Sequence, residues 1–226
     1  MTAAGLVTQV LIPAGGASLV GDLAIAPDGM GTVVFAHGSG SSRLSPRNRH
    51  VAQILRDAGL ATLLVDLLTP DEGAEDAITR SMRFDIPLLV HRLLDVVEWA
   101  RLRSPHPRPV GLFGASTGAA AALAVAALRP DLVDAVVSRG GRPDLVPELL
   151  GRVRAPTLLI VGGDDLPVIR FNEMARDGMR CECTLQIVPG ATHLFEEPGA
   201  LDTVAGLARD WFTRHLGARP IDPKEA

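Results

Sequence analysis

The stretch FGASTG, residues 113–118, places Ser116 between two glycines at the spacing G-x-S-x-G. An apolar run precedes it and an alanine-rich run follows it, which predicts a strand, a tight turn and a helix in that order. The glycines avoid collisions in such a turn, and the serine is held in a strained conformation with its hydroxyl exposed. The pattern predicts a nucleophile, provided that a base and an orienting acid lie nearby.

A glycine-rich turn for a dinucleotide is the alternative interpretation of this stretch. G-x-G-x-x-G is absent, and Ala119 or Ala120 stands where a phosphate loop would carry its lysine. Only Lys224 among the 22 basic residues is a lysine, so a lysine Schiff base is also disfavoured.

His193 is the histidine best placed to act as the base. It lies in a loop, VPGATHLFEE, just past the last predicted strand. His50, His91 and His215 fall within predicted helices, and His106 lies in a proline-rich loop, where surface or packing roles are expected.

The orienting acid is expected at the end of the preceding strand, LLIVGGDD, where Asp164 and Asp165 are adjacent. Neighbouring carboxylates cannot both face the same way, so we expect Asp165 to orient His193 and the other to cap a helix or face solvent. Asp144, after the strand before that one, is the remaining alternative. The chain order serine, aspartate, histidine is the one found in α/β-hydrolases.

An oxyanion needs backbone donors, and the glycine-marked loop FAHGSGSS follows the third predicted strand. The amides of Ser39 and Thr117 are the expected pair of donors. His37 is expected to order this loop and not to act as a second base.

Eight short apolar runs predict strands, and the later ones are separated by helical patterns. The runs begin near residues 5, 17, 32, 61, 109, 132, 157 and 183. Helices are expected over about 45–59, 86–103, 168–178 and 199–217, and a further helix, almost all alanine and leucine, is expected to start at Ser116. The first two strands are expected to form a hairpin across residues 13–16. This alternation predicts an α/β fold, a mostly parallel eight-stranded sheet with helices on both faces.

One domain over residues 1–217 and a frayed tail over 218–226 are expected from this pattern. Residues 67–85 form a polar segment that is expected either to cap the pocket or to be a solvated connection. Cys181 and Cys183 lie two apart without two further metal ligands nearby, so structural thiols are expected in place of a metal site.

The composition favours small substrates over macromolecular partners. The net charge is only -4, and the basic residues are scattered, which argues against nucleic acid or an anionic membrane as a partner. No apolar stretch reaches membrane-spanning length and no signal-peptide pattern opens the chain, so a cytoplasmic location is expected. The sequence leaves the oligomeric state open.

Taken in order, the motifs HGSGSS, GASTG, GGDD and GATHLF resemble those of the α/β-hydrolase superfamily, most closely the dienelactone hydrolase-related group. The resemblance implies a sheet with its second strand antiparallel, an acyl-enzyme on Ser116, His193 as base, Asp165 as its orienter, and no metal or organic cofactor. Dienelactone hydrolases proper carry a cysteine nucleophile where this chain has serine, so general esterase activity is expected in place of lactone specificity.

Four arginines follow the expected site loops, namely Arg43, Arg47, Arg139 and Arg142. They are expected either to bind an anionic substrate group or to pair with acids at the rim. A small ester is the expected substrate. Acyl transfer to another acceptor, thioester cleavage, and a non-catalytic ligand-binding relative stay open as alternatives.

Overall fold

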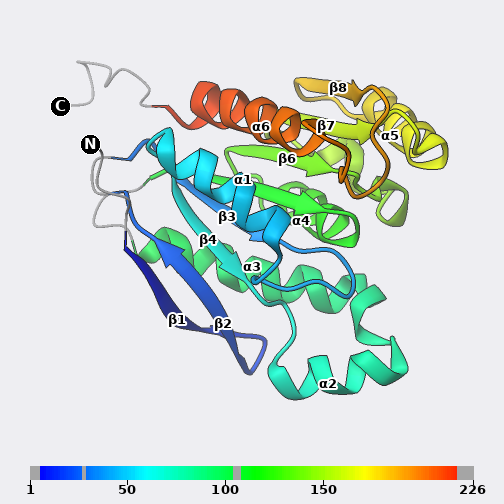
Figure 1. Cartoon of the computed structure of the whole chain (residues 1–226). Helices are drawn as coiled ribbons and strands as arrows, with labels where there is room; N and C mark the ends of the chain where they lie inside the picture. The colour runs from blue at the N-terminus through cyan, green and yellow to red at the C-terminus, as the bar shows by residue number, and fades with distance from the viewer. Residues whose placement is uncertain (1–5, 27–28, 104–107, 218–226) are drawn as a thin grey trace.

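A computed structural model describes residues 6–26, 29–103 and 108–217 of the 226-residue chain. The expected tail over 218–226 lies outside these residues, as does His106. Eight strands and six α-helices succeed one another along the described chain (Figure 1). No helix in this part of the protein has both the length and the apolarity needed to cross a membrane.

The strands form one eight-stranded sheet in the order β1-β2-β4-β3-β5-β6-β7-β8. Each strand predicted from the apolar runs is present, with the bounds β1 Val7–Ala14, β2 Ala17–Ala24, β3 Thr32–Ala36, β4 Ala61–Val65, β5 Val110–Ala115, β6 Ala135–Arg139, β7 Thr157–Gly162 and β8 Cys183–Val188. The expected hairpin joins β1 to β2, and β2 pairs antiparallel with both β1 and β4. From β4 through β3 to β8 every pairing is parallel, which confirms a mostly parallel sheet.

Helices cover both faces of the sheet. Their bounds are α1 Pro46–Asp57, α2 Pro70–Thr79, α3 Ile86–Leu102, α4 Thr117–Leu128, α5 Leu166–Gly178 and α6 Ala200–Leu216. Helices α1 and α6 pack together on one face, and α3 and α4 pack together on the other (Figure 1). Parallel strands buried on both faces explain why their sequences read as continuous apolar runs.

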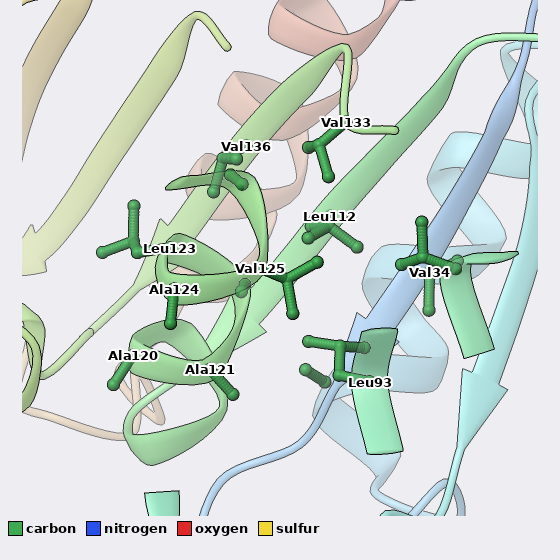
Figure 2. Packing of buried hydrophobic residues seen from close by; sticks show 14 of the residues in the cluster. Val34, Leu93, Leu112, Ala120, Ala121, Leu123, Ala124, Val125, Val133 and Val136 are labelled. Carbon is green, nitrogen blue, oxygen red and sulfur yellow. The ribbon is translucent and has the colours of Figure 1, made fainter. Parts of the chain in front are cut away.

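Successive residues of one strand belong to different cores. Val34 packs into the cluster under α3 and α4, whereas Val33 and Phe35 pack into the cluster under α1 and α6. In the first cluster, small alanines of α4 bring the helix close to Leu112 and Val136 of the strands (Figure 2). Eleven residues of α4 are buried, so this helix is fixed on the sheet directly behind the turn that contains Ser116.

The polar segment over residues 67–85 contains a helix that the apolar pattern does not predict. Thr69 caps α2 and accepts from the Glu72 amide, while the Glu72 carboxylate accepts from the Thr69 amide, which completes a capping box. A short 3₁₀ helix, η1 (Met82–Phe84), follows it. Arg92 of α3 donates to both Glu72 carboxylate oxygens, at 2.6 Å and 2.5 Å, and so fastens α2 to the body of the protein.

The Glu72–Arg92 pair predicts a pH-dependent contribution to stability. Its hydrogen bonds with Arg92 lower the pKa of Glu72 to about 2, below the ordinary value of 4.5. A lowered folded-state pKa stabilises the fold above pH 4.5, and this stabilisation is lost as the pH falls toward 2. We expect Glu72→Gln to cost about 1–2 kcal/mol at pH 7, because the carboxylate is partly exposed, and progressively less below pH 4.5.

Thermal unfolding between pH 7 and pH 2.5 measures this difference. Glu75→Gln is the matched control, because Glu75 lies on the same helix, is exposed and forms no ion pair within the described ranges. A Glu72→Gln deficit that stayed constant over this pH range would contradict the assignment.

Candidate active site

Ser116 lies at the turn between β5 and α4 with φ 52° and ψ −119°. A positive φ is uncommon for a residue with a side chain, and strain of this kind concentrates at functional sites. The helix that follows begins at Thr117, so Ser116 lies at its positive amino end. This is the strained strand-to-helix turn that the G-x-S-x-G spacing predicts.

The flanking glycines are required by close packing. A Cβ on Gly114 would lie 2.4 Å from the Ala119 Cα, and one on Gly118 would lie 2.2 Å from the Ala36 carbonyl oxygen. The end of β3 therefore lies directly against the turn. Gly38, in the loop after β3, also lies near the turn, because a Cβ there would lie 3.1 Å from the Ser116 Cβ.

This packing predicts that Gly118→Ala destabilises the protein by about 1–3 kcal/mol, because the backbone of β3 must move to admit the methyl group. The melting temperature should fall by roughly 2–4 °C for each kcal/mol. Gly206→Ala is the matched control, since nothing lies within 4 Å of the position of its Cβ. Calorimetry that found both variants equally stable would contradict the packing.

His193 and Asp165 form a direct contact. The His193 Nδ1 lies 2.6 Å from the Asp165 Oδ2, and an ionised carboxylate can only accept, so Nδ1 donates and Nε2 is left to take a proton. The loops after β7 and β8 are in close contact, since the Asp164 amide donates to the Ala191 carbonyl at 3.0 Å. A Cβ on Gly162 would lie only 2.3 Å from that carbonyl oxygen.

The other two candidates for the orienting acid, Asp144 and Asp164, make no hydrogen bond to His193 in the described structure. Asp144 accepts from Arg142 through both of its oxygens, at 2.8 Å and 2.7 Å. Asp164 is exposed. Asp165 occupies the N-cap position of α5, yet its side chain makes no capping hydrogen bond and is bound to His193 instead. Among these three acids, Asp165 is the one that can orient His193.

Ser116 and His193 both lie against the loop that follows β6. The Ser116 amide donates to the Arg139 carbonyl at 3.2 Å, and the Arg142 amide donates to the Ser116 carbonyl at 3.2 Å. Gly140 lies between these two contacts, and a Cβ on it would lie 3.3 Å from the His193 Cε1. No hydrogen bond joins the Ser116 hydroxyl to the His193 ring in the described structure, and such bonds are often long before substrate binds.

The predicted oxyanion donors line one cavity. Ser39 lies in the loop after β3, and Thr117 begins α4, so its amide has no acceptor one turn earlier in the helix. His37 holds this loop in place. Its Nε2 accepts from the Leu67 amide at 3.2 Å, so its Nδ1 carries the proton and donates to the Gly38 carbonyl at 2.9 Å. Burial lowers the pKa of His37, which favours this neutral ring and the ordering role expected from the sequence.

The cavity has a volume of about 600 Å³ and extends from the Ser39 loop to α2. Leu68, Leu89 and Ala77 supply apolar wall, and the charged groups in it are paired. Of these, Arg83 binds Asp76 and Arg43 binds Asp66. Because α2 forms part of its wall, the segment over 67–85 borders this cavity, which Ser39 and Thr117 also line, whereas Ser116 and His193 are not among its lining residues.

The four arginines expected near the mouth have different partners. Arg43 binds Asp22 and Asp66, Arg47 binds Glu196, and Arg142 binds Asp144. These three arginines therefore agree with the second expectation from the sequence, that arginines near the mouth pair with acids. Arg139 is 8% exposed and has no ion pair with any residue in the described ranges.

The two cysteines are free and partly buried. Burial raises the pKa of Cys181 and raises that of Cys183 to about 12, so neither thiol is ionised at neutral pH. Both pack against the core under α3 and α4, which agrees with structural thiols.

Comparisons with known proteins place this geometry in a family. Residues 31–155 match the family model described as the alpha/beta hydrolase fold. The crystal structure of a dienelactone hydrolase from Anabaena variabilis superposes with a TM-score of 0.91 and 54% sequence identity, covering 94% of this chain and 99% of that one. Est1E from Butyrivibrio proteoclasticus superposes with a TM-score of 0.75 at 16% identity, covering 92% of this chain and 98% of that one, and shares the fold.

A second kind of relative is longer. Two Mycobacterium tuberculosis proteins named "Putative phosphoribosyl transferase" are each 55% identical over 209 residues. The match covers 92% of this chain but only 46% of those proteins, so the chain spans about half the length of these curated relatives.

Proposed function

Because the chain belongs to the α/β-hydrolase fold family and is related to dienelactone hydrolase, we propose that it is a serine hydrolase that cleaves small carboxylic esters. The observation that carries the proposal is the strained turn at Ser116 together with the hydrogen-bonded pair of His193 and Asp165, because both lie against the loop after β6. In this proposal Ser116 is the nucleophile, His193 is the base in the correct tautomer, and Asp165 is the orienting carboxylate.

In the proposed reaction, His193 Nε2 takes the proton of Ser116 as the hydroxyl oxygen attacks the ester carbonyl carbon. The C=O π bond opens to an oxyanion, which the amides of Ser39 and Thr117 bind. The oxyanion then re-forms the carbonyl and breaks the bond to the alkoxy group, which leaves as an alcohol with the proton of His193. Asp165 stays ionised throughout and stabilises the imidazolium.

Water completes the cycle. His193 takes a proton from a water molecule, whose oxygen attacks the acyl carbon, and Ser116 leaves with that proton as the free acid forms. The cavity next to Thr117 is the proposed location of the ester's bulkier part. Its charged groups are neutralised by ion pairs, so we propose that this part is uncharged.

A related activity uses the same three residues. If an alcohol, amine or thiol replaced water in the second half, the protein would be an acyltransferase. The M. tuberculosis relatives carry a name from transferase chemistry, although they are about twice as long as the match, so product analysis is included in the test.

Hydrolysis of p-nitrophenyl esters of increasing acyl length, of a lactone and of a thioester tests the proposal, with products identified in the presence and absence of acceptors. We expect turnover of short acyl esters in water. Turnover only in the presence of an acceptor would favour the transferase, and no turnover by folded protein would favour a ligand-binding relative.

A further inference from the structure

Arg139, the last residue of β6, carries a buried guanidinium that has no partner among the residues that the structure describes. Its side chain is among the buried charged groups, and both Nε and Nη1 lack accessible surface and a hydrogen-bond acceptor within the described ranges. A charge in this position is strongly unfavourable unless an anion or ordered water satisfies it. The other three arginines near the site already have acids, so this residue needs a different explanation.

Its position is next to the proposed nucleophile. Arg139 pairs with Ala115 in the register of β5 and β6, and its carbonyl accepts from the Ser116 amide. Side chains alternate along a strand, so Arg139 points to the same face as Val137, the face covered by α1 and α6. This face is the one on which the first turn of α1 lies (Figure 1).

A second guanidinium belongs to the helix that covers this face. Arg47, in the first turn of α1, leaves its own Nε buried and without an acceptor, while its Nη1 donates to Glu196 at 2.9 Å. Burial, and then the nearby charge of Arg47, lower the pKa of Arg139 to about 10, so the group remains charged at pH 7. Glu197, the next acid along the chain, accepts from Thr192 and pairs with neither arginine.

The amino end of α1 adds to this positive field. Ser45 caps the helix, and the aligned peptide dipoles place partial positive charge at the first turn, where Arg47 lies. Within the described residues, three guanidinium nitrogens of Arg139 and Arg47 have no acceptor, and such a set of donors near a helix amino end suits an anion.

We propose that Arg139, assisted by Arg47, binds a carboxylate or phosphate group of the substrate and so determines a preference for anionic esters. This inference rests on the proposed ester hydrolysis. Arg139 pairs with Ala115 in the sheet and its carbonyl accepts from the Ser116 amide, so the proposed anion site lies next to the turn that contains the nucleophile. The uncharged part of the ester then occupies the cavity under α2.

Three substrates test the preference, namely p-nitrophenyl butyrate, mono-p-nitrophenyl glutarate and p-nitrophenyl phosphonoacetate. The wild type should prefer one of the charged esters, and the identity of the preferred one separates carboxylate from phosphate-type recognition. Arg139→Met should lower the ratio of kcat/KM for the charged ester to that for the neutral ester by about 10- to 100-fold, and Arg139→Lys should restore part of it. Arg154→Met is the control, since Arg154 is exposed, has no ion pair within the described ranges, and precedes β7 at the amino ends of the parallel strands, whereas Arg139 lies at a carboxyl end.

Thermal unfolding gives a second readout that does not depend on hydrolysis. Without added anion, Arg139→Met should melt no lower than wild type, because it removes an unpaired buried charge. Glutarate or inorganic phosphate should raise the melting temperature of the wild type and not that of the variant. A lower melting temperature for Arg139→Met together with no anion effect would mean that buried water satisfies Arg139 as a structural residue, and would overturn the inference.

The inference would also be overturned if Arg139→Met left unchanged the ratio of kcat/KM for the charged ester to that for the neutral ester. If the wild type hydrolyses no ester, the proposed function fails, while the anion-dependent melting still decides whether Arg139 binds an anion.

Discussion

Replacing Ser116 with alanine is expected to lower kcat for ester hydrolysis by about 10,000- to 1,000,000-fold. The variant keeps the strained turn, the oxyanion donors and the His193–Asp165 pair, but it has no atom to form the acyl bond. Activity at this level is measured with a p-nitrophenyl ester at high enzyme concentration. The KM is expected to change little, because the hydroxyl is small and its role lies in the chemical step.

Folding must be shown separately, because residue 116 has φ 52°, a backbone conformation that alanine, like serine, rarely adopts. Circular dichroism and thermal unfolding of Ser116→Ala provide this check. Ser18→Ala is the matched control, since Ser18 is exposed on the hairpin strand β2. A folded Ser116→Ala protein with more than about a hundredth of wild-type kcat would contradict nucleophilic catalysis at this residue.

Replacing Asp165 with asparagine is expected to lower kcat by about 1000- to 10,000-fold. The amide preserves the size of the side chain, but it no longer stabilises an imidazolium, and it can hold His193 in the wrong tautomer. Most of the loss should appear in kcat, measured near neutral pH with a saturating ester. The change removes charge at the 2.6 Å contact with His193 and leaves the nucleophile intact.

Two neighbouring acids serve as controls for this substitution. Asp164→Asn changes an exposed carboxylate one residue away and should leave kcat within about threefold of wild type. Asp144→Asn weakens the pair of hydrogen bonds that Arg142 donates to the Asp144 carboxylate, and it should affect stability more than kcat. If Asp144→Asn lost more activity than Asp165→Asn, the orienting acid would come from the loop after β6 instead.

The architecture follows from the sequence because it depends on local patterns. Continuous apolar runs predict strands buried on both faces, and all eight strands occur where these runs lie. The turn at Ser116 is also local, because glycines two residues before and after it leave room for the crowded backbone. By contrast, the helix α2 is polar and contains Gly73, so hydrophobic periodicity does not reveal it, although the Thr69, Pro70 and Glu72 signal for a helix start is present in the sequence.

Contacts between distant residues could not be predicted in the same way. Sequence order leaves two strand-end positions for the acid, and only the fold shows that Asp165, 28 residues before His193, is the one bound to it. Arg43 is paired with Asp22 and Asp66, which are more than 20 residues away, so its neutralisation is invisible in the sequence. That Arg139 has no ion-pair partner within the described part of the chain likewise becomes visible only in the fold.

Labelling with a fluorophosphonate tests the central claim most directly, because the probe reacts with a serine only where a base and an oxyanion site activate it. Intact-mass measurement followed by peptide mapping of wild type, Ser116→Ala and His193→Ala locates the adduct. We predict one adduct per chain on Ser116 in the wild type, none in Ser116→Ala, and strongly slowed labelling in His193→Ala. A folded wild-type protein that takes up no probe, or that carries the adduct on another residue, would contradict the account.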